Sequence, residues 1–263
     1  MIYAQDFTYD GIALSSISTD YIVAGFDDYE GEANILSRSV NRSDITYDQP
    51  LTYDYGAVDS DVYTFELTIL KKSGEGLTKS NVRDLVGWLM SPVVPKWLTF
   101  DGCGGEVYDG LCYMGRFTSV VYAGGSGSVK YGLTFKFESI SPYAFSVEHT
   151  YVAQPNTTIT INNTGTAVGK TILPKITIEP TATGIVTINN LDDDIGAFSI
   201  DVTANQTVIV ENHYCKLANG SIYPFTNLNN YNWVTIKDGE NRIVVTGDAT
   251  VTFQTRFFEA IGT

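Results

Sequence analysis

Short runs of alternating apolar and polar residues recur along the whole chain, and turns rich in Gly, Asp or Asn separate them. Side chains in a strand point to opposite faces in turn, so such a run is typical of a half-buried strand. The clearest run covers residues 62–70, and its apolar face consists of Tyr63, Phe65, Leu67 and Ile69. Similar runs occupy residues 131–137, 157–161, 175–178, 184–188, 207–210 and 250–253. Each has the length of an ordinary strand, so the pattern predicts a predominantly β protein.

One segment, residues 78–91, follows a helical pattern instead. Its apolar positions recur at i, i+3, i+4 and i+7, and they are Val82, Leu85, Val86 and Leu89. Thr78 is suited to cap the N-terminus of this helix, and Pro92 prevents its continuation. We interpret Trp88 as a packing anchor. The pattern therefore predicts a single helix laid against a sheet.

The character of the sequence changes near residue 145. Thirteen of the 17 tyrosines precede that point, whereas Asn and Thr are prominent after it. The segment 139–145 ends one unit, and the segment 153–156 opens another. We predict two domains, residues 1–147 and 148–263. The fold class is all-β with one helix: an N-terminal β-sandwich that carries the helix, followed by a second β-sandwich.

The composition limits the classes of function. Apolar residues make up 43% of the chain, which is enough for a buried core. The net charge of −14 repels phosphate backbones, so specific nucleic-acid binding is not expected. Three cysteines cannot form a complete disulfide framework. We expect no signal peptide and no membrane insertion, because the sequence has neither a basic-then-apolar start nor a long apolar run.

The motifs that suggest chemistry have simpler interpretations. Residues 165–171 look like a phosphate loop, but three residues separate the two glycines instead of four, so a turn is favoured. The carboxylates of residues 192–194 lack the alternating ligands of a calcium loop; a solvated turn is favoured, with weak cation binding left open. His213 and Cys215 have no further ligands at metal-site spacing. We expect no cofactor and no enzyme, although abundant carboxylates leave a glycosidase pair open.

Five segments of the first domain resemble, in their order, the distal tail protein family of siphophages. They are residues 7–14, 63–70, 82–89, 97–101 and 133–144. The last of them, an aromatic strand that runs into Ser-Pro-Tyr-Ala, is the most specific single match. The second domain is similar to the galectin-like jelly-roll module of larger members, in residues 174–178, 185–190, 198–202, 238–245 and 251–258. The chain departs from the family pattern at residues 37–44.

The resemblance implies a structural component of the tail tip. In that family a protruding hairpin, the belt, grips the neighbouring subunit of a hexameric ring. Residues 27–61 are long and polar, and their tyrosines suit an interface. We therefore expect an inter-subunit belt with Tyr47, Tyr53 and Tyr55; a mobile surface loop is the interpretation left open. The implied partners are the chain itself, the tail tube protein, the tail hub protein, and receptor-binding or baseplate proteins.

The implied location is the virion, with synthesis and assembly in the host cytoplasm. DNA would pass through the ring without being bound, so we expect few Lys or Arg side chains on the face that lines the channel. The alternative function is a monomeric carbohydrate-binding protein. Its sugar contacts would be Tyr231 and Trp233, beside Asn230 and Asn232. A packing Trp with turn asparagines is the favoured interpretation of that cluster.

Overall fold

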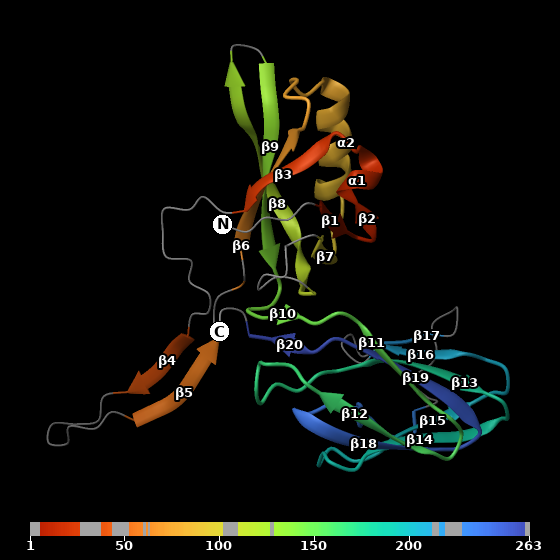
Figure 1. The fold of residues 1–263 in the computed structure, drawn as a ribbon. Helices are drawn as coiled ribbons and strands as arrows, with labels where there is room; N and C mark the ends of the chain where they lie inside the picture. Colours follow the sequence, from red (N-terminus) through yellow and green to blue (C-terminus); the bar gives the residue numbers. More distant parts are fainter. Residues whose placement is uncertain are drawn as a thin grey trace, which may run out of the picture. The chain divides into compact units, whose positions relative to one another are not determined.

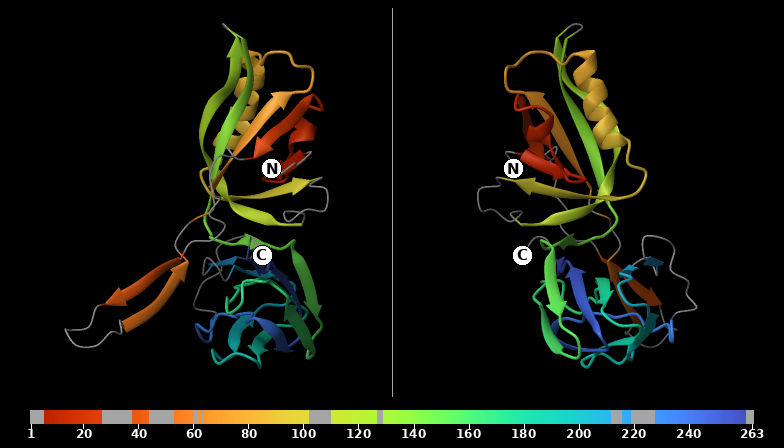
Figure 2. Two further views of the ribbon diagram at one scale, coloured as in Figure 1. Left: turned by 60° about the vertical axis from the view of Figure 1, so that its left-hand side comes forward. Right: turned by 90° about the vertical axis from the view of Figure 1, so that its right-hand side faces the viewer.

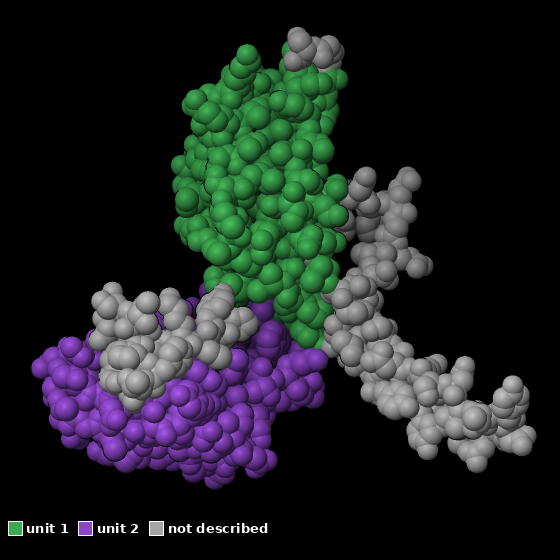
Figure 3. Space-filling view, turned by 180° about the vertical axis from the view of Figure 1, so that it is seen from behind, with its two compact units in different colours: residues 1–144, 260–263 green, residues 145–259 purple. Residues whose placement is uncertain are grey.

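The computed structural model is almost entirely β (Figure 1), with 55% of the chain in strands and 8% in helices. It describes residues 6–26, 38–43, 53–59, 62, 64–101, 110–126, 129–211, 216–218 and 228–260. The predicted all-β fold is confirmed. The chain divides into two compact units (Figure 3): unit 1 comprises residues 1–144 with 260–263, and unit 2 comprises residues 145–259.

Unit 1 contains one large antiparallel sheet. Its strands follow the order β2-β1-β7-β8-β9-β6-β3. Their bounds are β1 Asp6–Tyr9, β2 Ile12–Ala13, β3 Tyr21–Phe26, β6 Thr64–Lys71, β7 Lys96–Asp101, β8 Cys112–Ser126 and β9 Val129–Ser139. Two more strands, β4 (Arg38–Ser43) and β5 (Tyr53–Asp59), form a separate two-stranded sheet.

The turn between β1 and β2 shows how local sequence sets this topology. Asp10 and Gly11 both have positive φ angles, 53° and 76°. Two central residues with positive φ are what a tight type I′ hairpin needs, and Asp-Gly adopts that geometry at low cost. The segment 7–14, which resembles the opening of the distal tail protein family, thus contains a strand, a tight turn and a second strand.

The predicted helix is α2, Lys79–Met90, and its cap is the predicted one. The backbone N–H of Asn81 donates to the Thr78 hydroxyl at 3.2 Å, and the backbone N–H of Thr78 donates back to the Asn81 side chain at 3.0 Å. This reciprocal pair satisfies donors that a helix N-terminus leaves open. A second helix, α1 (Leu14–Ile17), was not predicted, since a single turn without a side-chain cap leaves little periodicity to detect.

The core of unit 1 is aromatic. Leu85 and Leu89 of α2 are buried in it, beside rings from six of the strands. The Phe65 ring stacks on Phe137 at 4.9 Å between centroids. Trp88 stacks on Phe7 at 5.3 Å, and its indole N–H donates to the Tyr9 carbonyl at 3.3 Å. Trp88 is thus a packing anchor, as predicted.

Unit 2 is a sandwich of two antiparallel sheets that enclose an aliphatic core. The five-stranded sheet has the order β11-β19-β13-β16-β17, with bounds His149–Ala153, Ala249–Thr255, Lys175–Pro180, Val208–Glu211 and Lys216–Ala218. The four-stranded sheet has the order β12-β18-β14-β15, with bounds Thr158–Asn163, Gly239–Thr246, Gly184–Asn190 and Phe198–Val202. The short strands β10 (Ala144–Phe145) and β20 (Phe258–Glu259) pair with each other.

Candidate assembly surfaces

The predicted belt region contains the β4–β5 hairpin. The two strands pair antiparallel from Arg38 opposite Asp59 to Ser43 opposite Tyr53, with one irregularity after Val40. Among the described strands, each of the two pairs only with the other. Tyr53 and Tyr55, two of the three predicted belt tyrosines, lie on β5, but their side chains are outside the described part of the structure. Tyr47 is outside the described residues altogether.

A second surface lies at the far end of the β8–β9 hairpin (Figure 2). The last residue of β6 to pair with β9 is Leu70, opposite Gly132, so the strand segments nearer the hairpin turn pair only with each other. Large apolar side chains are exposed in and next to this part of the hairpin: Val129 and Tyr131 lie within it, and Val121 and Tyr122, on opposite faces of β8, lie just before it. We call these four residues the hairpin-tip cluster. The Lys130 ammonium lies 5.8 Å from the centroid of the Tyr122 ring.

The sequence pattern contains a signal for the hairpin-tip cluster. The predicted strand begins at residue 131, but the alternation assigns its apolar residues all alike to the core. Tyr131 continues the same face as Leu133 and Phe135, which are buried, yet it is 38% exposed. Where the apolar alternation of a strand continues beyond the part that the helix covers, the apolar side chains stay exposed. Such surfaces often serve as interaction sites.

The candidate sugar contacts, Tyr231 and Trp233, occupy one loop of unit 2. Trp233 is partly buried against the core, with its ring 6.3 Å from that of Phe198. Tyr231 is 70% exposed. The side-chain amides beside them bind their own protein: Asn230 donates to the Ala197 carbonyl at 2.7 Å, and Asn232 donates to the same oxygen at 3.3 Å. The structure therefore brings the predicted residues together but uses Trp233 and the amides for packing and loop support.

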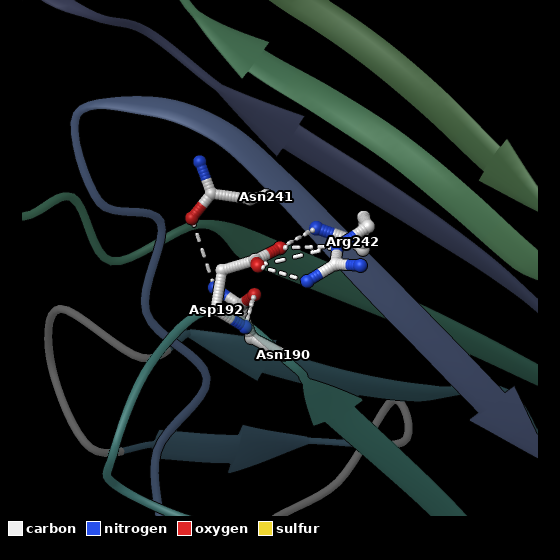
Figure 4. A network of polar contacts seen from close by, with 4 residues as sticks. All are labelled: Asn190, Asp192, Asn241 and Arg242. Carbon is white, nitrogen blue, oxygen red and sulfur yellow. Dashed lines mark hydrogen bonds and ion pairs between the residues drawn. The ribbon is translucent and has the colours of Figure 1, made fainter.

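A buried network of amides lies near this loop (Figure 4). Asn190 donates to the side-chain oxygen of Asn241 and to the backbone carbonyl of Thr235, both at 2.9 Å. Asn241, which is fully buried, donates to the carbonyls of Lys237 and Gly239, also at 2.9 Å each. The network fixes the loop that precedes β18, because both amides hydrogen-bond to backbone groups of that segment.

Sequence reasoning missed this network, although its signal is in the alternation. Asn190 continues the buried face of Val186 and Ile188, and Asn241 begins that of Ile243 and Val245. An Asn at a position where the alternation requires an apolar residue indicates a buried amide with fixed partners.

The acidic turn at residues 192–194 is engaged with its own chain. The Asp192 carboxylate accepts hydrogen bonds from the Arg242 guanidinium, the shorter at 2.6 Å, and from the Arg242 backbone N–H. These bonds lower the pKa of Asp192 from 3.8 to about 2. The Asp193 carboxylate accepts from the Thr235 hydroxyl and from the backbone N–H of Ile195. The described residues contain no group of three His, Cys, Asp or Glu side chains that could hold a metal ion.

The remaining motifs are turns or packing groups where they are described. In the segment 165–171, the backbone N–H and the hydroxyl of Thr166 both donate to the Glu259 carboxylate. His149 stacks on Phe257, with 4.8 Å between ring centroids. His213 and Cys215 lie outside the described residues. No helix in the described part of the chain is long and apolar enough to cross a membrane.

Two family models match the chain in succession. One describes a phage tail protein N-terminal domain and matches residues 2–141; the other describes a phage tail C-terminal domain and matches residues 143–255. No curated protein sequence matches the chain.

Solved phage proteins share the fold over nearly the whole chain. The Dit protein of phage SPP1, described as a paradigm of the hub adsorption apparatus in phages that infect Gram-positive bacteria, superposes with a TM-score of 0.64 at 15% identity. That match covers 96% of this chain and 98% of the SPP1 protein. A chain of the phage P2 baseplate in its activated conformation with Ca matches with a TM-score of 0.58 at 11% identity, covering 95% and 97%. The same baseplate with Sr gives 0.59 at 12% identity, with the same coverage.

Proposed function

The chain belongs to the phage tail protein family whose N- and C-terminal domains it matches, and we propose that it is the distal tail protein of a long-tailed phage. In this role six copies form a ring that joins the tail tube to the tip or baseplate, and DNA passes through the ring during ejection. The fold that it shares with SPP1 Dit and with a baseplate chain supports the proposal.

The observation that carries the ring is the pairing of β4 with β5 alone. A two-stranded hairpin without further strands is at best marginally stable in water. Among the described strands, none extends this hairpin into a larger sheet. The hairpin gains stability if it lies against another protein surface, and in a ring the adjacent subunit offers one. We propose that residues 38–59, with Tyr53 and Tyr55 on β5, form this inter-subunit belt, and that Tyr47 belongs to it.

One further feature supports an assembling unit 1. The hairpin-tip cluster gathers exposed apolar side chains near one end of the β8–β9 hairpin. We propose that the tip cluster contacts a neighbouring subunit or the tail tube.

For unit 2 we propose a galectin-like module that serves as a platform for tail-tip or baseplate proteins. The alternative, a monomeric carbohydrate-binding protein, has less support. Sugar recognition needs an open aromatic face beside polar groups that are available to the ligand. Trp233 packs on the core, and the amides of Asn230 and Asn232 hold the Ala197 carbonyl.

The acidic balance fits the passage of DNA. Residues 1–145 carry 10 basic and 19 acidic side chains, a net charge of −9. A cationic lumen would retain the duplex through its phosphates, whereas an acidic or neutral lumen repels it over about one Debye length, roughly 8 Å at physiological salt. We propose that unit 1 lines the channel with few Lys or Arg side chains. A structure of the assembled ring with a continuous belt of basic side chains around the axis would contradict this.

The belt is tested by replacing residues 38–59 with a short Gly-Ser connection. We expect the variant to lose the oligomer while circular dichroism and the melting of the subunit stay the same, because the hairpin adds interface and not core. The matched control is Tyr231→Ala, which should leave the oligomer intact. Unfolding of the shortened subunit would instead place the hairpin in the core of unit 1.

A further inference from the structure

The four-stranded sheet of unit 2 has two edge strands, β15 and β12, and they differ in whether another segment is hydrogen-bonded to them. The β15 edge is covered by the segment that begins at residue 228: Asn229 donates from its backbone to the Ser199 carbonyl at 3.0 Å, and the Ser199 N–H donates to the Asn230 side chain at 3.3 Å. At β12, no described residue outside β18 is hydrogen-bonded to the backbone between Thr158 and Asn162. Among the described residues, the β15 edge is therefore closed and the β12 edge is open.

The ladder shows which backbone groups the open edge presents. The N–H of Val245 donates to the Thr157 carbonyl, so residue 157 faces β18. In an antiparallel pair, the backbone N–H and C=O groups of successive residues point alternately toward and away from the partner strand. Those of Ile159 and Ile161 therefore also point toward β18. The N–H and C=O groups of Thr158, Thr160 and Asn162 accordingly point away from the sheet. They form three donor–acceptor sets, spaced about 6.6 Å apart, which is the spacing that another strand requires.

The β12 edge also lacks the features by which proteins protect a free edge. Such edges are usually blunted by charged side chains, by Pro or by a bulge. Between Glu148 and Lys170 the chain has no Asp, Glu, Lys or Arg, although its net charge is −14. The strand itself, Thr-Ile-Thr-Ile-Asn-Asn, contains no Pro, and its register with β18 is unbroken.

The side chains on β12 limit what can pair with it. Thr158, Thr160 and Asn162 are exposed on one face, and they suit uncharged polar neighbours such as Thr or Ser. On the other face Ile161 is fully buried, but Ile159 is only partly covered by the core. An incoming strand would therefore place an apolar side chain beside Ile159 and uncharged polar ones beside the exposed face.

We propose that β12 is a strand-addition site, at which an extended, uncharged segment of another tail protein pairs antiparallel along Thr158–Asn162. The identity of the partner as a tail protein rests on the proposed function. Recognition comes from the six outward backbone groups, and the alternating side chains set the register.

A second copy of this chain is the weaker occupant. In a six-fold ring the only two-fold operation is the 180° rotation about the ring axis, which runs through the channel, so the β12 strands of neighbouring copies cannot pair with each other around a two-fold axis. A contact of one short strand also buries far less than the roughly 1,000 Å² that a specific interface needs, so it adds to an assembly that other contacts already hold. The uncharged edge also suits an extended segment of a partner protein that other contacts already hold in the assembly.

The test uses the full chain and a defined probe, the acetylated and amidated peptide Ser-Thr-Val-Thr-Val-Thr-Ser at millimolar concentration. Amide hydrogen exchange is followed by nuclear magnetic resonance. We expect the peptide to slow exchange severalfold at Thr158, Thr160 and Asn162, with no change at Ile159 and Ile161, which already face β18. This alternating pattern is specific to strand addition, since nonspecific adsorption of the peptide would not select every second amide.

Two substitutions at the edge make the test stricter. Thr160→Pro removes one outward N–H, and Thr160→Lys places a charge on the exposed face without touching the core; each should abolish the protection. The control is Thr246→Lys, at an exposed position on the interior strand β18, which should bind the peptide like the parent chain. If Thr160→Pro fails to fold, Thr160→Lys still decides the question.

Three outcomes would overturn the proposal: no protection, protection of all five amides alike, or protection in the peptide-free protein that rises with protein concentration and disappears in Thr160→Lys. The last would identify a second copy as the occupant. The mass of the assembly is measured in the same samples. Alternating protection without a ring would refute the proposed ring alone, and a ring without protection would refute the strand-addition site alone.

Discussion

The two units bury different kinds of side chain in different architectures. Unit 1 packs Phe, Tyr and Trp rings between one sheet and a single long helix, and the other face of the sheet carries exposed charged residues. Unit 2 closes Ile and Val side chains between two sheets and holds its loops with buried amides. A sandwich covers the inner face of each sheet with the other sheet. A single sheet with one helix leaves more surface for other subunits to cover.

The difference indicates that unit 1 leaves more surface for other subunits to cover, whereas unit 2 covers most of its own. Unit 1 contains the β4–β5 hairpin and the hairpin-tip cluster, both of which lack a covering element among the described residues. In unit 2 the β12 edge of the four-stranded sheet is open among the described residues, and this edge is neutral and narrow. We therefore associate ring formation with unit 1 and attachment of further tail proteins with unit 2. The predictions that follow separate the two units, beginning with the largest effect.

The largest expected effect comes from removing one buried ring from the core of one unit at a time. Phe135 of unit 1 and Phe253 of unit 2 are both fully buried. Replacing either with Ala removes a ring that packing cannot restore, so each should lower the free energy of unfolding of its own unit by about 3–5 kcal/mol. Scanning calorimetry should show one transition shifted in Phe135→Ala and another in Phe253→Ala. A single transition that shifts equally in both variants would show that the units do not unfold independently.

A smaller loss is expected from the amide network, which has no counterpart in the aromatic core. Asn241→Ala removes the hydrogen bonds that Asn241 makes with the Gly239 carbonyl and the Lys237 backbone N–H, and one of the two that the Asn190 amide donates. We expect a loss of about 2–3 kcal/mol for unit 2 alone, measured by urea unfolding. The control is the exposed Asn162→Ala, expected to change stability by under about 0.5 kcal/mol. Equal losses in the two variants would mean that the network does not stabilise the sandwich.

At Tyr9 of unit 1 we expect a substitution that raises stability, in contrast to the two losses above. Its hydroxyl is fully buried and has no hydrogen-bond partner among the described residues, and burial raises the pKa of Tyr9 to about 12. Tyr9→Phe removes the unpaired hydroxyl but keeps the ring against Phe117. We expect a gain of about 1 kcal/mol in the stability of unit 1. A loss of stability would reveal a partner for the hydroxyl.

The smallest effect is one that acid removes. The Arg242 hydrogen bonds hold the pKa of Asp192 at about 2, below the ordinary 3.8. A carboxylate whose pKa is depressed by folding stabilises the native state above its unfolded pKa, and this contribution is lost as the pH falls from about 4 to about 2. We expect Asp192→Asn to lower the melting temperature of unit 2 at pH 6 but not at pH 2, while unit 1 is unchanged. An equal shift at both pH values would assign the effect to lost packing.

Much of the fold was predictable because alternation and capping act locally. The core positions of β6, the Thr78 cap and the Asp10-Gly11 turn follow from neighbouring residues, and the resemblance to distal tail proteins is confirmed by the family models and the shared fold. The alternation includes Asn190, Asn241 and Tyr131, but only the strand order shows that the two amides are buried and that the Tyr131 ring is exposed. The open β12 edge likewise required the strand order.

The central claim is that six copies of this chain form a ring, and the mass of the purified full-length protein tests it most directly. Native mass spectrometry, or sedimentation at physiological salt, should give six times the chain mass of 28.8 kDa. The predicted result is this hexamer for the full chain and a monomer, lighter than 28.8 kDa by the residues removed, after residues 38–59 are replaced. A full-length protein that stays at 28.8 kDa at all concentrations, with and without its tail partners, would contradict the account.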